Sequence, residues 1–63
     1  MNIIKDEKGR VIGRELDNGQ LLDGKGRLVA RLVNGGQMTV NEHGENKGRG
    51  DQRMRLLKPY EDQ

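Results

Sequence analysis

The chain has 63 residues, 30% of them hydrophobic and 35% charged, with a net charge of +2 and no Phe, Trp or Cys. This length allows one small domain, and the missing cysteines exclude disulfide bonds. There is no apolar run long enough to span a membrane and no basic start followed by an apolar run, so we expect a cytoplasmic protein without a membrane segment.

A short motif occurs three times, at 6–14, 23–31 and 41–49, and each copy places a turn before a strand. Asp or Asn opens each turn, because its side chain hydrogen-bonds the backbone two residues later. Gly9, Gly26 and Gly44 follow three residues later, where a type I turn with a bulge requires a left-handed conformation. Alternating side chains after each turn predict a strand.

A second class of turn joins these units. Asn-Gly pairs at 18–19 and 34–35 are strong hairpin signals, and Gly50-Asp51 occupies the same relative place. In chain order we expect about seven short strands, at 2–5, 10–16, 20–23, 27–33, 37–40, 45–49 and 52–58. The predicted fold is therefore all-β, a small antiparallel meander with an internal repeat of 17–18 residues and pseudo-symmetric units.

The segment 52–58 fits two structures. Met54 and Leu57 also lie at helical spacing, but the segment occupies the strand position of the repeat, so we predict a strand. Pro59 ends it, because proline has no amide hydrogen to donate. We expect a single domain over 1–58 and a polar C-terminal tail over 59–63.

One position in each copy is small and is followed by arginine. The pairs are Gly13-Arg14, Ala30-Arg31 and Gly48-Arg49. Small residues let backbones approach closely, as at the axis of a pseudo-symmetric ring, and the three arginines then predict a site for phosphate or carboxylate. The alternative is three ordinary surface arginines whose stems pack over apolar neighbours.

Aliphatic side chains share the strand face that carries these arginines. They are Ile12, Leu16, Val29 and Val33. A sheet this small does not bury both faces unless it closes on itself, so these residues predict a subunit or partner interface. A closed mini-barrel or a two-layer fold is an equal alternative. Because the core is small, we also expect a homo-oligomer.

The residues needed for catalysis are scarce. The chain has no Ser, one Thr and one His, and nothing marks Thr39 and His43 as a pair. No further ligands gather near His43 in the sequence, so we expect no metal site, no cofactor and no enzyme activity.

The motifs Gly9-Arg10, Gly13-Arg14, Gly26-Arg27, Ala30-Arg31 and Gly48-Arg49 resemble the β-flower kind of small bacterial β-hairpin repeat domain over residues 6–49. The resemblance implies a compact, pseudo-symmetric β-structure, and it implies no activity and no functional residue. The third unit departs from the pattern, with Glu45 and Asn46 where the others have arginine and an aliphatic residue.

These features favour a non-enzymatic small interaction module that docks on another protein, as an adaptor or an inhibitor. The alternative is binding of a polyanion, either nucleic acid or a phosphorylated small ligand, through Arg14, Arg31 and Arg49. A locally basic C-terminal third, including Lys47, Arg53, Arg55 and Lys58, supports nucleic acid. The absence of stacking aromatic residues argues against a single-strand platform.

Overall fold

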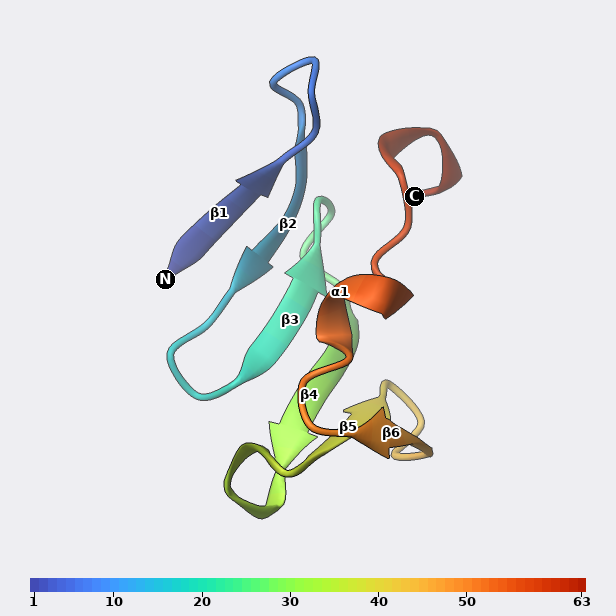
Figure 1. Ribbon diagram of the computed structural model, residues 1–63. Helices are drawn as coiled ribbons and strands as arrows, with labels where there is room; N and C mark the ends of the chain where they lie inside the picture. The colour runs from blue at the N-terminus through green and yellow to red at the C-terminus, as the bar shows by residue number, and fades with distance from the viewer.

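Six strands follow one another along the chain and pair in that same order, which makes one antiparallel meander (Figure 1). The computed structural model describes all 63 residues, with β1 (Asn2–Lys5), β2 (Val11–Glu15), β3 (Gln20–Asp23), β4 (Leu28–Val33), β5 (Met38–Asn41) and β6 (Asn46–Arg49). The all-β meander is confirmed, and each of these strands lies within one residue of its expected bounds. None of the helices is long and apolar enough to cross a membrane.

The seventh strand, expected at 52–58, does not form. The chain leaves the sheet at Gly50 (φ 67°) and makes one turn of helix, α1 (Arg53–Leu56). The cause is local: the side chain of Asp51 accepts a hydrogen bond from the Arg53 N–H at 3.1 Å, and the Thr39 hydroxyl accepts one from the Gln52 N–H at 2.8 Å. These amides are therefore not free to pair with β6. Two short 3₁₀ turns, η1 (Asn34–Gly36) and η2 (Tyr60–Asp62), complete the elements.

The turns of the three motif copies share one set of hydrogen bonds. In each, a side-chain oxygen of Asp6, Asp23 or Asn41 accepts from the backbone N–H groups two and four residues later, at 2.9–3.0 Å. The glycines of these turns have φ of 79°, 83° and 79°, which confirms the expected left-handed conformation.

The third turn keeps a side-chain bridge although its residues differ. In the first two turns, Arg10 and Arg27 donate from Nε to the aspartate of the turn at 2.8 and 2.9 Å. In the third turn Asn41 Nδ2 donates to Glu45 Oε1 at 2.7 Å. Glu45 thus replaces the arginine of the other two turns but keeps a side-chain hydrogen bond to the first residue of the turn, with donor and acceptor exchanged. A pseudo-symmetric relation between whole units stays a prediction.

Each hairpin closed by this turn carries one extra residue in its second strand. Ile12, Val29 and Lys47 fall where the register of β1–β2, β3–β4 and β5–β6 shifts. Bulges bend a strand and increase its twist. The sheet is accordingly strongly twisted, and β5 and β6 run across the direction of β1 and β2 (Figure 1).

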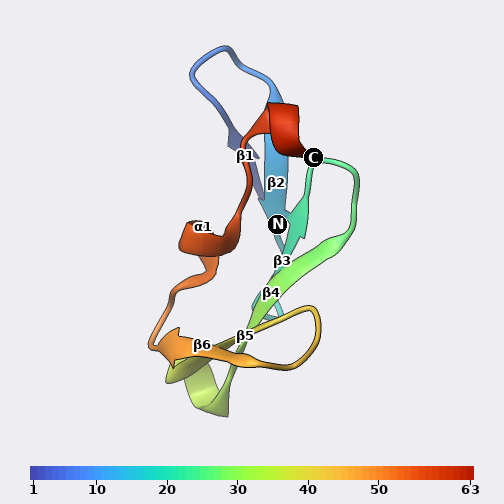
Figure 2. The ribbon, with the colours of Figure 1, turned by 90° about the vertical axis from the view of Figure 1, so that its right-hand side faces the viewer.

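The C-terminal segment covers one face of the sheet, as the side view shows (Figure 2). Under it Leu21 and Ala30 are fully buried. Val40 lies on the opposite face of the sheet, where it pairs with Arg31, and it is also buried, at 6% exposure. Thr39 is also fully buried, and its hydroxyl donates to the Gly50 carbonyl at 2.7 Å. The core is thus much smaller than the number of aliphatic residues suggests.

The residues of the expected polar tail, 59–63, lie against the sheet. The Gln63 side chain donates to the Ile12 carbonyl at 2.7 Å and accepts from the Gly24 N–H at 2.7 Å. Arg10 bonds Glu61 at 2.8 Å and lies over the Tyr60 ring, 4.3 Å from its centre. The tail therefore fastens the end of the chain to the β1–β2 and β3–β4 hairpins.

Candidate functional site: the arginine face

Strand register places Arg14, Arg31 and Arg49 on the same face of the sheet. Residues that pair across strands share a face, and so do residues two apart on one strand. The connecting pairs are Arg14 with Leu22, Gln20 with Arg31, Arg31 with Val40, and Met38 with Arg49. We call this surface the arginine face; it comprises Ile3, Arg14, Leu16, Gln20, Leu22, Arg31, Val33, Met38, Val40 and Arg49.

The small residue before each arginine points the opposite way, toward the C-terminal segment. A Cβ on Gly13 would lie 3.2 Å from the Leu57 side chain, and one on Gly48 would lie 3.0 Å from Gln52 Cγ. Ala30 lies between them and is fully buried. Residues 52–57 therefore lie over these positions. The paired strand also limits Gly13, since the same Cβ would lie 2.9 Å from the Leu22 carbonyl oxygen, and Gly48 has a φ of 137° that favours glycine.

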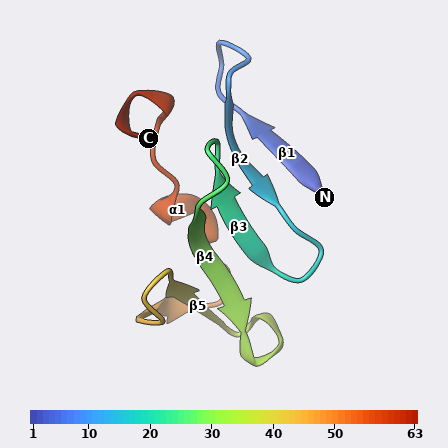
Figure 3. The same cartoon turned by 180° about the vertical axis from the view of Figure 1, so that it is seen from behind.

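No helix covers the arginine face, although Val40 within it is only 6% exposed. Seen from behind, β3 and β4 have no helix in front of them, because α1 and the C-terminal residues lie beyond the sheet (Figure 3). The surface predicted to suit a partner therefore lies on the side of β3 and β4 that faces away from α1.

The three arginines of this face are also the ones without partners inside the chain. Arg10 and Arg27 bond the turn aspartates, Arg53 bonds Asp51, and Arg55 donates to the Lys47 carbonyl at 2.8 Å. The side chains of Arg14, Arg31 and Arg49 form no hydrogen bond or ion pair within the chain, and the Nε of Arg14 is buried without an acceptor. Arg31 and Arg49 are exposed, so their donors remain available to a ligand, whereas the Nε of Arg14 is shielded from solvent.

The spacing of these arginines fits an extended ligand better than one small anion. They lie on β2, β4 and β6, so two strand spacings separate each from the next. At about 4.8 Å per spacing, neighbouring backbones are roughly 10 Å apart. This makes a row across the sheet, which matches successive carboxylates or phosphates on a partner.

Of the four residues expected at an interface, the structure places two beside the arginines. Leu16 and Val33 follow Arg14 and Arg31 by two residues and share their face. Ile12 and Val29 occupy bulges instead. Val29 lines a pocket of about 420 Å³ with Leu56 and Gln63, so it faces the C-terminal segment.

The pocket is lined by polar and apolar side chains from the β3–β4 hairpin and the C-terminal segment. Its charged groups have mixed signs, and Asp23 within it is committed to its turn. Burial opposes ionisation of Asp23, but hydrogen bonds from Arg27 and Lys25 outweigh it and hold the pKa of this carboxyl below its ordinary value. No group of three or more His, Asp or Glu side chains comes together to hold a metal ion.

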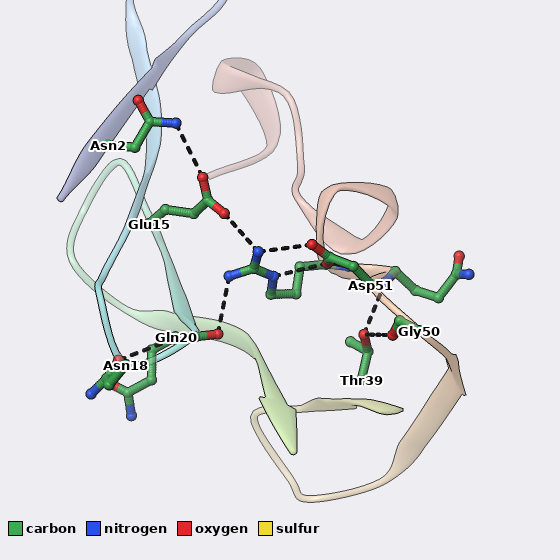
Figure 4. A network of polar contacts seen from close by, with 10 residues as sticks. Asn2, Glu15, Asn18, Gln20, Thr39, Gly50 and Asp51 are labelled. Carbon is green, nitrogen blue, oxygen red and sulfur yellow. Dashed lines mark hydrogen bonds and ion pairs between the residues drawn. The ribbon is translucent and has the colours of Figure 1, made fainter. Parts of the chain in front are cut away.

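Sequence analysis missed a buried arginine that joins α1 to the β2–β3 hairpin. The Arg53 side chain is 8% exposed and donates to Glu15 at 2.6 Å, to Asp51 at 2.8 and 2.9 Å and to the Gly19 carbonyl at 3.1 Å (Figure 4). The spacing of Asp51 and Arg53 hinted at a local pair, but Glu15 is 38 residues away in the chain. Arg53 therefore belongs to the fold and not to a basic surface.

The Asp51–Arg53 pair should make stability depend on acid pH. Hydrogen bonding from Arg53 lowers the pKa of Asp51 to about 2. A lowered carboxylate pKa stabilises the fold above about pH 4, and that stabilisation is lost as pH falls toward 2. Asp51 is half exposed, so after solvent screening we expect about 1 kcal/mol. Urea unfolding of the parent and of Asp51→Asn should differ by this amount at pH 6 and converge near pH 2; parallel pH profiles would contradict the assignment.

In comparisons with known proteins, no family model, curated protein or solved structure matches the chain. The fold and the site together define a small all-β meander with one covered face and one open, arginine-bearing face.

Proposed function

We propose that this chain is a non-enzymatic docking module, an adaptor or an inhibitor, whose arginine face binds an acidic surface of a partner protein. One observation carries the proposal: Arg14, Arg31 and Arg49 share a face that no helix covers and their side chains have no hydrogen-bond partner, while the other four arginines are bonded within the chain. Arginine is the cation best suited to bidentate carboxylate binding at interfaces.

The residues between the arginines favour a protein over nucleic acid. Leu22, Val33 and Met38 are half-buried on the arginine face, so each guanidinium has apolar neighbours. Protein interfaces combine methionine, arginine and aliphatic contacts in this way. A phosphate backbone would contact the arginines and leave the aliphatic side chains without apolar partners.

Binding of a polyanion is the second candidate, and a row of arginines on strands roughly 10 Å apart supports it. Successive phosphates could engage such a row, and counterion release would then make affinity fall steeply as salt rises. An acidic protein segment that also buries aliphatic side chains should lose less affinity with salt, because the apolar contribution is not screened.

Two probes separate these candidates. An extended peptide of alternating glutamate and leucine and a short DNA duplex are titrated into the chain, with amide and arginine Nε shifts recorded at two salt concentrations. For protein docking we expect the peptide to shift Leu22, Arg31 and Met38, and to bind at least about tenfold more weakly to the triple variant Arg14→Gln, Arg31→Gln, Arg49→Gln.

The matched control removes the same charge elsewhere, through Lys8→Gln, Lys25→Gln and Lys58→Gln. The peptide should bind this control about as well as the parent. Equal loss in the two triple variants, or no peptide shifts on the arginine face, would overturn the proposed docking site. Binding of the duplex alone would overturn protein docking and support the polyanion alternative.

A further inference from the structure

The two outer edges of the sheet are protected differently. β1 and β6 are the edge strands, and an unpaired edge presents backbone groups that another strand can bond. On β6, Arg55 Nη2 donates to the Lys47 carbonyl at 2.8 Å and Gln52 Nε2 donates to the Arg49 carbonyl at 3.1 Å. Side chains of the α1 region therefore occupy the acceptors of this edge.

The edge formed by β1 has no such cover. The polar side chain at its start, Asn2, bonds Glu15 of the neighbouring strand. The Asp6 N–H donates inward to the Arg10 carbonyl, and bonding direction alternates along a strand, so the backbone groups of Ile3 and Lys5 point away from β2. Ile3 is also 44% exposed. This edge is therefore open and partly apolar.

We propose that a second copy of the chain pairs antiparallel with β1, with Ile3 on the two-fold axis. In this register the outward backbone groups of the two Ile3 residues bond each other, and the Met1 carbonyl faces the Lys5 N–H of the other copy, while the Met1 ammonium keeps its bond to Asp17. The contact is isologous, so it closes after two copies. Because side chains occupy the Lys47 and Arg49 carbonyls of β6, the remaining edge of the joined sheet is less open to further pairing. The inference rests on the edges and does not depend on the acidic partner proposed above.

Charge argues against the other ways in which two copies could meet. Pairing two arginine faces would bring six unpartnered guanidinium groups together, and like charges oppose that contact. A two-fold axis at Ile3 is perpendicular to the sheet and keeps both arginine faces on the same side. The dimer would thus present both rows to one partner, and simultaneous engagement would raise its avidity.

Sedimentation equilibrium of the whole chain tests the pairing through Ile3→Pro. Proline removes only an N–H that points away from β2, and proline is tolerated on edge strands. We expect the parent to reach twice the 7.1 kDa of one chain at high concentration. Ile3→Pro should weaken association at least about tenfold, because symmetry removes two hydrogen bonds, whereas Ile3→Val should change it by less than about threefold.

Amide hydrogen exchange of the parent supplies a second measurement without a substitution. Protection of the Ile3 amide should increase with protein concentration, while the Ile4 amide, which bonds β2, should be protected at all concentrations. A chain that stays monomeric at millimolar concentration, a dimer that Ile3→Pro does not weaken, or concentration-dependent protection at β6 instead would overturn the proposal. Protection of Ile3 only after a foreign extended peptide is added would also overturn it, in favour of a different occupant.

Discussion

Replacing Arg53 with methionine should remove about 3 kcal/mol of stability, enough to unfold a large fraction of the chain. Breaking a buried ion pair by deleting one partner typically costs about 3–5 kcal/mol, because the remaining charges stay desolvated. Glu15 and Asp51 keep some contact with water, which places the expected cost at the lower end. A domain of this size has a total stability of only about 3–9 kcal/mol. Urea unfolding followed by circular dichroism measures the difference.

Arg49→Met is the matched control for Arg53→Met, since it makes the same chemical change at an arginine without partners. We expect it to alter stability by less than about 0.5 kcal/mol. A second comparison tests the cause: in a Glu15→Gln, Asp51→Asn background, Arg53→Met should cost clearly less, because neutral amides replace the stranded carboxylates. Equal effects of Arg53→Met and Arg49→Met would show that the buried pair does not hold α1 on the sheet.

The strands could be predicted from the sequence because their turns are local. Asp6 and Gly9 lie within five residues of one another and specify their turn by their own hydrogen bonds and φ. The same holds for the turn at Asp23 and Gly26. Once the turns are fixed, alternation sets the face of each strand, which is why the shared face of Arg14 and Arg31 was accessible from sequence.

What the sequence did not reveal depends on contacts between distant residues. The strand expected at 52–58 becomes a helix because Thr39, on β5, accepts the Gln52 N–H. Arg53 is buried because it bonds Glu15, the last residue of β2, and the Gly19 carbonyl in the β2–β3 turn, both more than 30 residues earlier in the chain. The bulge at Val29 likewise changes the direction of a side chain that simple alternation had placed beside Arg31. Local patterns carry no information about such contacts.

Gly13→Ala should cost about 1–3 kcal/mol, because the position has no room for a methyl group. The backbone of Gly13 is not left-handed, so the cost is steric. The new Cβ would lie 2.9 Å from the Leu22 carbonyl oxygen and 3.2 Å from both terminal carbons of Leu57. The carbonyl belongs to the paired strand and has little freedom to move, so Leu57 and the C-terminal segment must shift. Thermal and urea unfolding should show the loss.

A double-mutant cycle with Leu57→Ala separates the crowding by Leu57 from that by the carbonyl. If residues 52–57 require a small residue beneath them, Gly13→Ala should be less costly once Leu57 is truncated, with a coupling of about 0.5 kcal/mol or more. Gly35→Ala is the comparison for backbone strain alone, since Gly35 has φ 66° and no atom within 4 Å of the added Cβ. If the effects of Gly13→Ala and Leu57→Ala on the unfolding free energy are simply additive, a small residue is needed at position 13 for pairing with β3 and not for packing of the C-terminal segment. Coupling would instead show that a small residue is needed before Arg14 so that residues 52–57 can pack on this face of the sheet. Because the C-terminal segment packs there, it does not cover the opposite face, which carries the arginines.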